Sequence, residues 1–229
     1  MTHVGVITGL AVEADILSEF PLERAPRVEI AGASAARAES AARGLLERGC
    51  AAILSFGVAG GLDPALEPGT IVIADAVVGV DGRHHPTDAL WRGKVLRALE
   101  GSGPLAVGAI FGSDKPLLTA DAKKECAART KAIAVDMESF GAASAAVARG
   151  TSFLAIRAIA DGASRTIPPW VMDAIQPDGG LAPGAILRAL LPKPWMVWGL
   201  LGLARDQGRA LGALRRVATR LGPGLGFAL

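Results

Sequence analysis

The chain contains a series of short, almost uninterrupted apolar runs, and this feature limits its possible folds most. Such runs are typical of strands buried on both faces, which occur in parallel sheets covered by helices. The runs predicted as strands are residues 4–8, 28–31, 51–56, 70–78, 105–111, 132–135 and 152–160. Segments with helical character lie at residues 11–20, 34–48, 91–99, 119–130 and 137–149. This order predicts an α/β fold of three layers, with helices on both faces of a central, twisted, mostly parallel mixed sheet.

The composition of the chain changes after Asp161. Residues 164–194 are rich in Pro and Gly, and residues 195–221 have the pattern of an amphipathic helix. Residues 1–161 carry 16 Lys and Arg against 19 Asp and Glu, whereas residues 162–229 carry 8 against 3. We therefore divide the chain into a main domain, residues 1–165, and a C-terminal extension with a basic amphipathic helix, residues 166–229. Trp195, Trp198 and the arginines favour contact with a membrane surface, and packing on the body or on another subunit is the alternative.

Composition also excludes several classes of protein. With 51% hydrophobic and 20% charged residues, the 229-residue chain is not disordered. A net charge of +2 and an aromatic content of 4%, without Tyr, argue against nucleic-acid binding. No apolar run reaches the ~18 residues of a membrane span, no signal peptide is visible, and Cys50 and Cys126 fit a reducing compartment. We expect a cytoplasmic protein, with peripheral contact at the inner face of the membrane left open.

Polar residues follow the ends of several predicted strands, where ligands bind in open α/β sheets. These residues are Glu13, the glycine-rich segment 57–61, Ser113, Asp114, Asp136, Glu138, Arg157 and Asp161. Several carboxylates at one edge predict acid–base chemistry. The adjacent His84 and His85 have no Cys or His residues nearby, so we predict no metal site.

Four segments resemble, in family order, motifs of the methylthioadenosine/S-adenosylhomocysteine nucleosidases in the purine nucleoside phosphorylase superfamily. They are residues 5–13 (GVITGLAVE), 56–62 (FGVAGGL) with 68–75 (PGTIVIAD), 134–139 (AVDMES) and 157–161 (RAIAD). The resemblance implies that residues 1–165 form a nucleoside phosphorylase-like catalytic domain that binds a purine nucleoside, needs no cofactor and assembles as a homo-oligomer.

The resemblance also implies roles for individual residues. Asp161 would donate a proton to the purine, and a dry pocket would keep this acid protonated near neutral pH. Glu138 would hold the ribose hydroxyls with Met137 beneath the sugar, while Glu13 and Arg157 would act on the acceptor. The glycine loop near the acceptor would comprise Gly57, Val58, Ala59 and Gly60. The residues near the base would be Val135, Asp136, Ser113 and Asp114.

Two departures from the nucleosidases bear on the acceptor and the substrate. Val58 stands where the nucleosidases have Ser, and the Arg and Ser with which phosphorylases hold phosphate have no clear counterpart, although Arg37 is a candidate substitute. Glu13 favours water as the acceptor, whereas Arg37 favours phosphate. Both water and phosphate therefore remain open as acceptors. The segment before Val28 is shorter than in the nucleosidases, which leaves room for a larger 5′ group.

The chain is similar over nearly its whole length to the hopanoid-associated phosphorylases of bacteria. Shared features include residues 55–64 (SFGVAGGLDP), 168–169 (PP), 178–179 (DG), 203–206 (LARD) and 214–217 (LRRV). This resemblance implies adenosylhopane as substrate, with adenine released and ribosylhopane or its 1-phosphate formed. The alternatives are a general methylthioadenosine/S-adenosylhomocysteine nucleosidase and a non-catalytic binding scaffold, against which Glu13, Glu138 and Asp161 argue.

Overall fold

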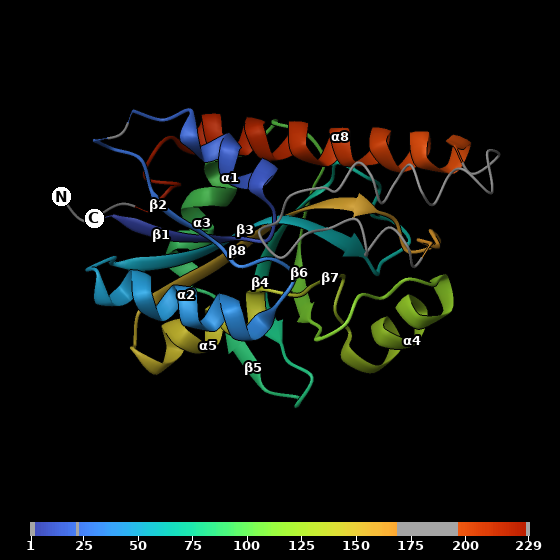
Figure 1. The fold of residues 1–229 in the computed structure, drawn as a ribbon, viewed down its shortest axis with the longest axis horizontal. Coiled ribbons are helices and arrows are strands. Elements are labelled where there is room, and N and C mark those ends of the chain that lie inside the picture. Colours follow the sequence, from blue (N-terminus) through green and yellow to red (C-terminus); the bar gives the residue numbers. More distant parts are fainter. Residues whose placement is uncertain (1–2, 22, 169–196, 228–229) are drawn as a thin grey trace.

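The computed structural model describes residues 3–21, 23–168 and 197–227 (Figure 1). The strands are β1 (Val4–Thr8), β2 (Arg27–Ile30), β3 (Ala52–Gly61), β4 (Ile71–Val78), β5 (His84–Pro86), β6 (Leu105–Gly112), β7 (Ala134–Asp136) and β8 (Ser152–Asp161). The helices are α1 (Ala11–Ser18), α2 (Ala35–Glu47), α3 (Ala89–Ala98), α4 (Ala120–Thr130), α5 (Ser139–Ala148) and α8 (Val197–Leu221). Trp195, Pro169 and the pair 178–179 lie outside the described residues.

The eight strands form one sheet in the order β2-β1-β3-β7-β6-β4-β5, and β8 pairs with both β3 and β4. In the described ranges, five of the strand pairs are parallel and three are antiparallel. The predicted α/β fold with a mostly parallel mixed sheet is therefore confirmed.

Five of the strands are paired in a closed circuit, which the sequence did not predict. Strand β3 pairs with β8, β8 with β4, β4 with β6, β6 with β7, and β7 again with β3. The circuit closes because β3 has ten residues: its length runs parallel to β8, while Gly60 and Gly61 at its end pair with β7. The functional residues of β3, β7 and β8 therefore belong to one hydrogen-bonded framework.

The predicted loop at residues 57–61 is wrong, because this segment continues β3. The backbone from Gly57 to Gly60 pairs with β8, so it is extended rather than turned. Residues 84–86, which match none of the expected strands, form a short strand, β5, which pairs with β4. Glycine-rich composition indicated a turn, but ladder partners on both sides of β3 make the extended conformation more favourable.

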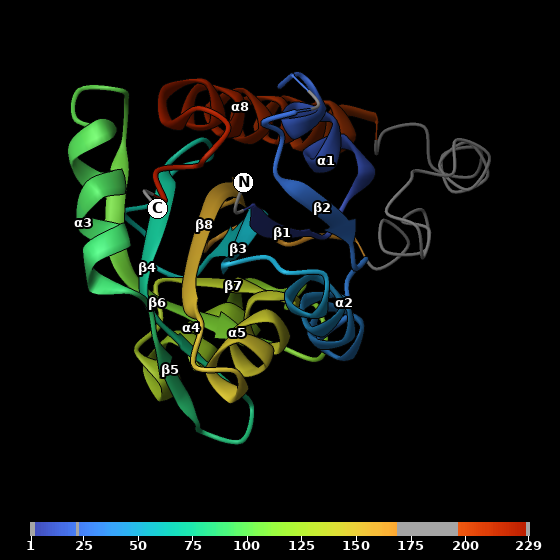
Figure 2. The same ribbon diagram turned by 90° about the vertical axis from the view of Figure 1, so that its left-hand side faces the viewer.

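Helices cover both faces of the sheet, and each face has its own apolar core (Figure 2). Helices α1 and α8 lie on one face, where Leu17, Leu214 and Val217 are buried together. Helices α2 and α5 lie on the opposite face, where Leu45 and Ala142 belong to the second cluster. The three-layer arrangement is the one that the alternation of strands and helices predicts.

Helix α8 packs into the first of these cores. Ala210, Leu214 and Val217 are buried, and the Nε1 atom of Trp91 donates to the carbonyl of Leu225 at 2.9 Å just beyond the helix. The arginines of this helix are exposed at positions 205, 209, 215, 216 and 220. The domain division at residue 165 stays a prediction, but α8 itself contributes to the same core as the strands. No helix in the described ranges is both long and apolar enough to span a membrane.

Helices α2 and α5 contact closely through small residues, and this contact gives a stability prediction. A Cβ atom at Gly141 would overlap the carbonyl oxygen of Ala35 and lie 3.0 Å from the nitrogen of Glu39, both backbone atoms of α2. We expect Gly141→Ala to lower the free energy of unfolding by about 1–3 kcal/mol, because the helices must separate to relieve the overlap.

The matched control is Gly208→Ala in α8, where no atom lies within 4 Å of the new Cβ. This change should raise the free energy of unfolding by about 0.4–1 kcal/mol through the unfolded state. Urea unfolding of both variants measures the contrast, and equal effects would contradict the packing argument.

Candidate active site

Glu13 lies in the first turn of α1 and joins this turn to β3. Its Oε2 accepts the backbone N–H groups of Gly9 and Leu10 at 2.8 and 2.9 Å, and its Oε1 accepts that of Val58 at 2.8 Å. A Glu at the third position of a helix satisfies N–H groups that the helix start leaves unpaired. Burial raises the pKa of the Glu13 carboxyl, while the charge of Arg157 and the three amide hydrogen bonds oppose that rise.

Arg157 is fully buried on β8 and lies among carboxylates. Its Nε is 2.6 Å from Oδ2 of Asp136, and its Nη2 is 3.2 Å from Oε2 of Glu138 and donates to Oγ of Ser55 at 2.6 Å. Burial lowers the pKa of the guanidinium, but Asp136, Glu138 and Glu13 outweigh this effect and leave it raised. One arginine faces three carboxyl groups, so the cluster has an excess of negative charge when all three are ionised.

Glu138 occupies the N-cap position of α5 but makes no side-chain hydrogen bond to that helix. Its carboxylate instead lies beside Arg157 and against Gly9, where an added Cβ would be 2.9 Å from Oε1. Burial raises the pKa of Glu138 to about 8, with Arg157 opposing and Asp136 and Glu13 adding to the rise. The side chain is thus held for a task other than capping.

The raised pKa of Glu138 predicts how stability depends on pH. A carboxyl whose pKa is higher in the folded state stabilises the protein below its unfolded pKa, and this contribution is lost as pH rises towards the folded value. Between pH 4.5 and 8, Glu138 should therefore lower the free energy of unfolding by up to about 1.4 kcal/mol per pH unit. We expect Glu138→Gln to flatten this decline, as urea unfolding at pH 5, 6, 7 and 8 would measure. Parallel curves for the two proteins would contradict it.

Asp136 and Ser139 hold Arg157 in place from the start of α5. The Asp136 carboxylate accepts the backbone N–H of Ser139 at 3.1 Å and also its hydroxyl, and its backbone carbonyl accepts the N–H of Ser113 at 2.8 Å. The side-chain carboxylate and the backbone carbonyl of Asp136 are therefore both hydrogen-bonded within the protein. The hydroxyl oxygens of Ser139 and Ser55 lie 3.1 Å apart, where Ser55 can donate to Ser139, and this contact completes a buried network around the guanidinium.

Gly57 allows the groups on α1 and β8 to meet. A Cβ atom there would lie 2.7 Å from Nη1 of Arg157 and 2.7 Å from Oε1 of Glu13. Any larger residue would push these two side chains apart, so the glycine serves close approach rather than a turn. Glu13, Asp136, Glu138 and Arg157 are thus brought together by α1, β7, β8 and the start of α5.

Asp161 lies at the end of β8, beyond this cluster. Strand β8 has one extra residue relative to β3 here, because Ala59 pairs with Ile159 and Gly60 with Asp161. A Cβ on Gly60 would lie 3.4 Å from Oδ2 of Asp161, so this glycine leaves space beside the carboxylate. Burial raises the pKa of Asp161, and the ammonium group of Lys123 opposes the rise.

Lys123 is the site residue that sequence reasoning missed. Charged residues on a helix ordinarily face solvent, yet Lys123 of α4 is completely buried and paired with Asp161. Lys123 lies three residues before the buried Cys126, so the two share one face of the helix. That spacing was the available signal.

The other predicted site residues are distributed around the same edge. Val135 is buried and would be 3.2 Å from a Cβ on Gly60, while Met137 is half-buried. Ser113 is buried and donates its hydroxyl to the carbonyl of Lys115, whereas Asp114 is exposed. In the part of the chain that the structure describes, no group of three or more His, Cys, Asp or Glu residues could hold a metal ion.

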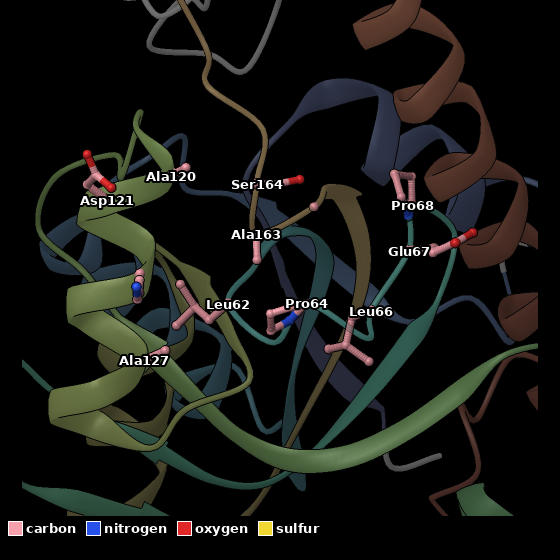
Figure 3. Close-up of a pocket in the computed structure, with 12 residues that line it drawn as sticks. Leu62, Pro64, Leu66, Glu67, Pro68, Ala120, Asp121, Ala127, Ala163 and Ser164 are labelled. Carbon is pink, nitrogen blue, oxygen red and sulfur yellow. The ribbon is translucent and has the colours of Figure 1, made fainter.

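A cavity of about 620 Å³ lies beside the chain that directly follows Asp161 (Figure 3). Leu62, Pro64 and Leu66 line it from the segment after β3, and Ala120 and Ala127 line it from α4. The chain directly after Asp161, residues 162–164, forms a third wall. Its lining is mostly apolar, and none of the four clustered residues faces it.

The sequence matches the Phosphorylase superfamily over residues 25–191, which is most of the chain. A search of curated protein sequences gave no significant match.

Solved structures agree in fold. A 5′-methylthioadenosine/S-adenosylhomocysteine nucleosidase from Neisseria meningitidis superposes with a TM-score of 0.73 at 17% identity, covering 96% of this chain and 99% of that one. An S-adenosylhomocysteine nucleosidase from Streptococcus pyogenes gives 0.66 at 19%, covering 94% and 95%. A futalosine hydrolase from Helicobacter pylori gives 0.70 at 15%, covering 94% and 96%.

Proposed function

We propose that this chain, which belongs to the Phosphorylase superfamily, is an enzyme that cleaves a nucleoside N-glycosidic bond and removes adenine from a 5′-substituted adenosine with water as the acceptor. The observation that carries this proposal is the buried cluster of Glu13, Asp136 and Glu138 around Arg157. Breaking the bond from ribose to purine leaves positive charge on the sugar and negative charge on the base. An excess of fixed negative charge stabilises the cationic ribosyl centre without reorganisation.

Each carboxylate has a separate role in this proposal. Glu138 has no capping bond to make and is free to accept the ribose hydroxyls. Glu13 takes a proton from the attacking water, whose oxygen bonds to the sugar carbon as the bond to the base breaks. Asp161 delivers a proton to the purine, which leaves as neutral adenine. Asp136, with both polar groups bonded within the protein, positions Arg157 rather than the base.

The contacts of Glu13 favour water over phosphate. The amides of Gly9, Leu10 and Val58 would suit an anion, but the Glu13 carboxylate already occupies them. Arg157 is paired with Asp136 and Glu138, and Ser55 is bonded to Arg157. Arg37 is exposed and donates to the carbonyl of Ala31 at 2.5 Å. A phosphate dianion would add like charge to a cluster that already has an excess of it.

Within this substrate class we propose adenosylhopane as the natural substrate. The support is the resemblance to hopanoid-associated phosphorylases and the short connection between Ser18 and Arg27, where α1 ends and β2 begins. A general nucleosidase is the second candidate, favoured by superposition on methylthioadenosine/S-adenosylhomocysteine nucleosidases along almost the whole chain.

Adenine release from three substrates tests these statements: adenosylhopane, methylthioadenosine and S-adenosylhomocysteine. We expect release from adenosylhopane to be fastest, at a rate that is unchanged by excess phosphate and without a sugar 1-phosphate product. Faster release from methylthioadenosine would establish the general nucleosidase. A phosphate-dependent rate would overturn the assignment of water.

We further propose a cytoplasmic homo-oligomer that contacts the inner face of the membrane through α8. The apolar side of α8 is buried in the core, so the contact would be electrostatic, through exposed Arg205, Arg209, Arg216 and Arg220. Each arginine near an anionic surface contributes about 1 kcal/mol. Deleting α8 would remove part of the core, so the test is binding of Arg205→Glu/Arg209→Glu to vesicles with and without anionic lipid. Arg43→Glu on α2 is the control, and equal binding of all proteins would contradict the proposal.

A further inference from the structure

The ammonium group of Lys123 is fully occupied and cut off from water. Its Nζ donates to the Asp161 carboxylate, to the carbonyl of Gly162 at 2.9 Å and to that of Arg165 at 3.2 Å. These three bonds use all three protons of an ammonium group. The side chain is 1% exposed, so its charge has one anionic partner, which is Asp161.

The two oxygens of Asp161 lie in different surroundings. Oδ2 accepts the ammonium proton, whereas Oδ1 accepts no hydrogen bond from any residue in the described ranges. The carboxylate remains 13% exposed, and the absent side chain of Gly60 leaves space beside it. The arrangement therefore has an inner oxygen bonded to Lys123 and an outer oxygen open to a ligand.

This pairing conflicts with a simple reading of Asp161 as a self-protonated acid. A cation in contact favours the carboxylate form, so Lys123 opposes the rise in the pKa of Asp161 that burial causes. The pair can instead exist as ammonium and carboxylate or as amine and carboxylic acid, and both forms hold the same number of protons. Burial disfavours separated charges and so brings the neutral form within reach.

We infer that Lys123 positions Asp161 and supplies its proton, so that the pair, rather than Asp161 alone, protonates the departing purine. A proton moves from Nζ to the Asp161 carboxylate, and the carboxylic acid so formed passes it to the purine nitrogen, while the electron pair of the broken glycosidic bond stays on the base. Lys123 is left as an amine beside the carboxylate. After adenine leaves, a proton from solvent returns to Lys123 through Asp161, whose carboxylate is partly exposed. This inference rests on the proposed function of Asp161.

Other charged groups near Asp161 are already paired with each other. Arg165, in the segment after β8, donates to Asp206 of α8 at 2.6 Å, and these two act on Asp161 in opposite directions. Lys124 and Asp121 of α4 line the adjoining cavity. Lys123 is the cation in contact with the carboxylate.

Lys123→Arg separates proton supply from charge. Arginine keeps the positive charge and can bond to the carboxylate, but it does not release a proton in proteins. We expect kcat for adenine release to fall by about 100-fold or more, the range for loss of general acid catalysis. Lys124→Arg, one position along on the exposed side of α4, should leave kcat unchanged. Full activity of Lys123→Arg would overturn the inference.

Lys123→Met adds a pH readout that a purely structural role would not change. Without the ammonium, Asp161 must take its proton from solvent, so activity should survive at acidic pH and decline at lower pH than in the wild type. The double variant Lys123→Met/Asp161→Asn removes both charges and shows whether loss of folding explains the result. A pH profile parallel to that of the wild type would also overturn the inference.

The ¹³C resonance of the Asp161 carboxyl, identified by its loss in Asp161→Asn, tests the pair without an activity assay. We expect it to titrate in Lys123→Met but to stay constant between pH 5 and 8 in the wild type. Identical titrations of this resonance in the wild type and in Lys123→Met would refute the inference that Lys123 and Asp161 share a proton. The wild type could release no adenine and still differ from Lys123→Met in this titration. In that case the proposed function fails, but the inference that Lys123 and Asp161 share a proton is retained.

Discussion

Arg157→Met is expected to lower the free energy of unfolding by about 3–5 kcal/mol, the loss seen when one partner of a buried ion pair is removed. The guanidinium is fully buried and contacts Asp136 and Glu138, with Glu13 close by. Methionine fills much of the same volume but leaves these carboxylates without a cation. The loss should grow with pH, because the abandoned carboxyls can escape their charge by protonation at low pH.

Urea unfolding at pH 5 and pH 8 measures this loss. The double variant Asp136→Asn/Arg157→Met should recover part of the stability, because it removes one of the unpaired charges with its partner. Arg149→Met, at an exposed arginine that pairs with Glu47 on the surface, should change stability by less than about 1 kcal/mol. A similarly small effect for Arg157→Met would show that the buried cluster does not need its cation.

Glu13→Gln is expected to reduce kcat for adenine release by about 10²–10⁴-fold, the contribution of a general base. An amide is similar in shape to the carboxylate but cannot take a proton from water. It also places an NH₂ group against a backbone N–H of Gly9, Leu10 or Val58, since both oxygens of Glu13 accept such bonds. Because that amide loses a hydrogen bond, stability should fall by about 1–3 kcal/mol.

Steady-state kinetics separates the two effects. A loss confined to kcat at unchanged KM indicates a role in the transition state, whereas a raised KM indicates altered substrate binding. Glu39→Gln, at an exposed carboxylate on α2, is the control for the same chemical change outside the site. A kcat within threefold of the wild type would remove Glu13 from the proposed mechanism.

The sequence predicted most of the fold because the buried strands and the helices each have a distinct apolar pattern. The expected strand at residues 4–8 is β1, and the expected helical segment at residues 119–130 contains α4, which Thr119 caps by accepting the N–H of Ala122 at 3.2 Å. Local signals of this kind do not depend on distant contacts. The glycine-rich end of β3 was misjudged because its extended form depends on pairing with β7 and β8, which lie far along the chain.

The candidate site was predicted only in part, because some of its residues have local sequence signals and one does not. Glu13, Asp136, Glu138 and Arg157 carry motif signals, and the structure brings these four together. Their roles stay predictions. Lys123 has no such signal, since a lysine on a charged helix ordinarily faces water, and its burial depends on Asp161, 38 residues later. Sequence patterns show which residues belong to a functional motif. They do not show as readily which two charged residues will pair in the folded protein.

The closed circuit of strands has a mechanical consequence for how this enzyme accommodates its substrate. A strand in the circuit cannot slide without breaking ladder bonds on both of its edges, so Gly57, Val135 and Arg157 keep fixed relative positions when a nucleoside enters. Adjustment to different 5′ groups must then come from chain that leaves the circuit, such as the connection from α1 to β2. Exchange of that connection between relatives is therefore a direct way to change the preferred substrate while leaving the bond-breaking apparatus untouched.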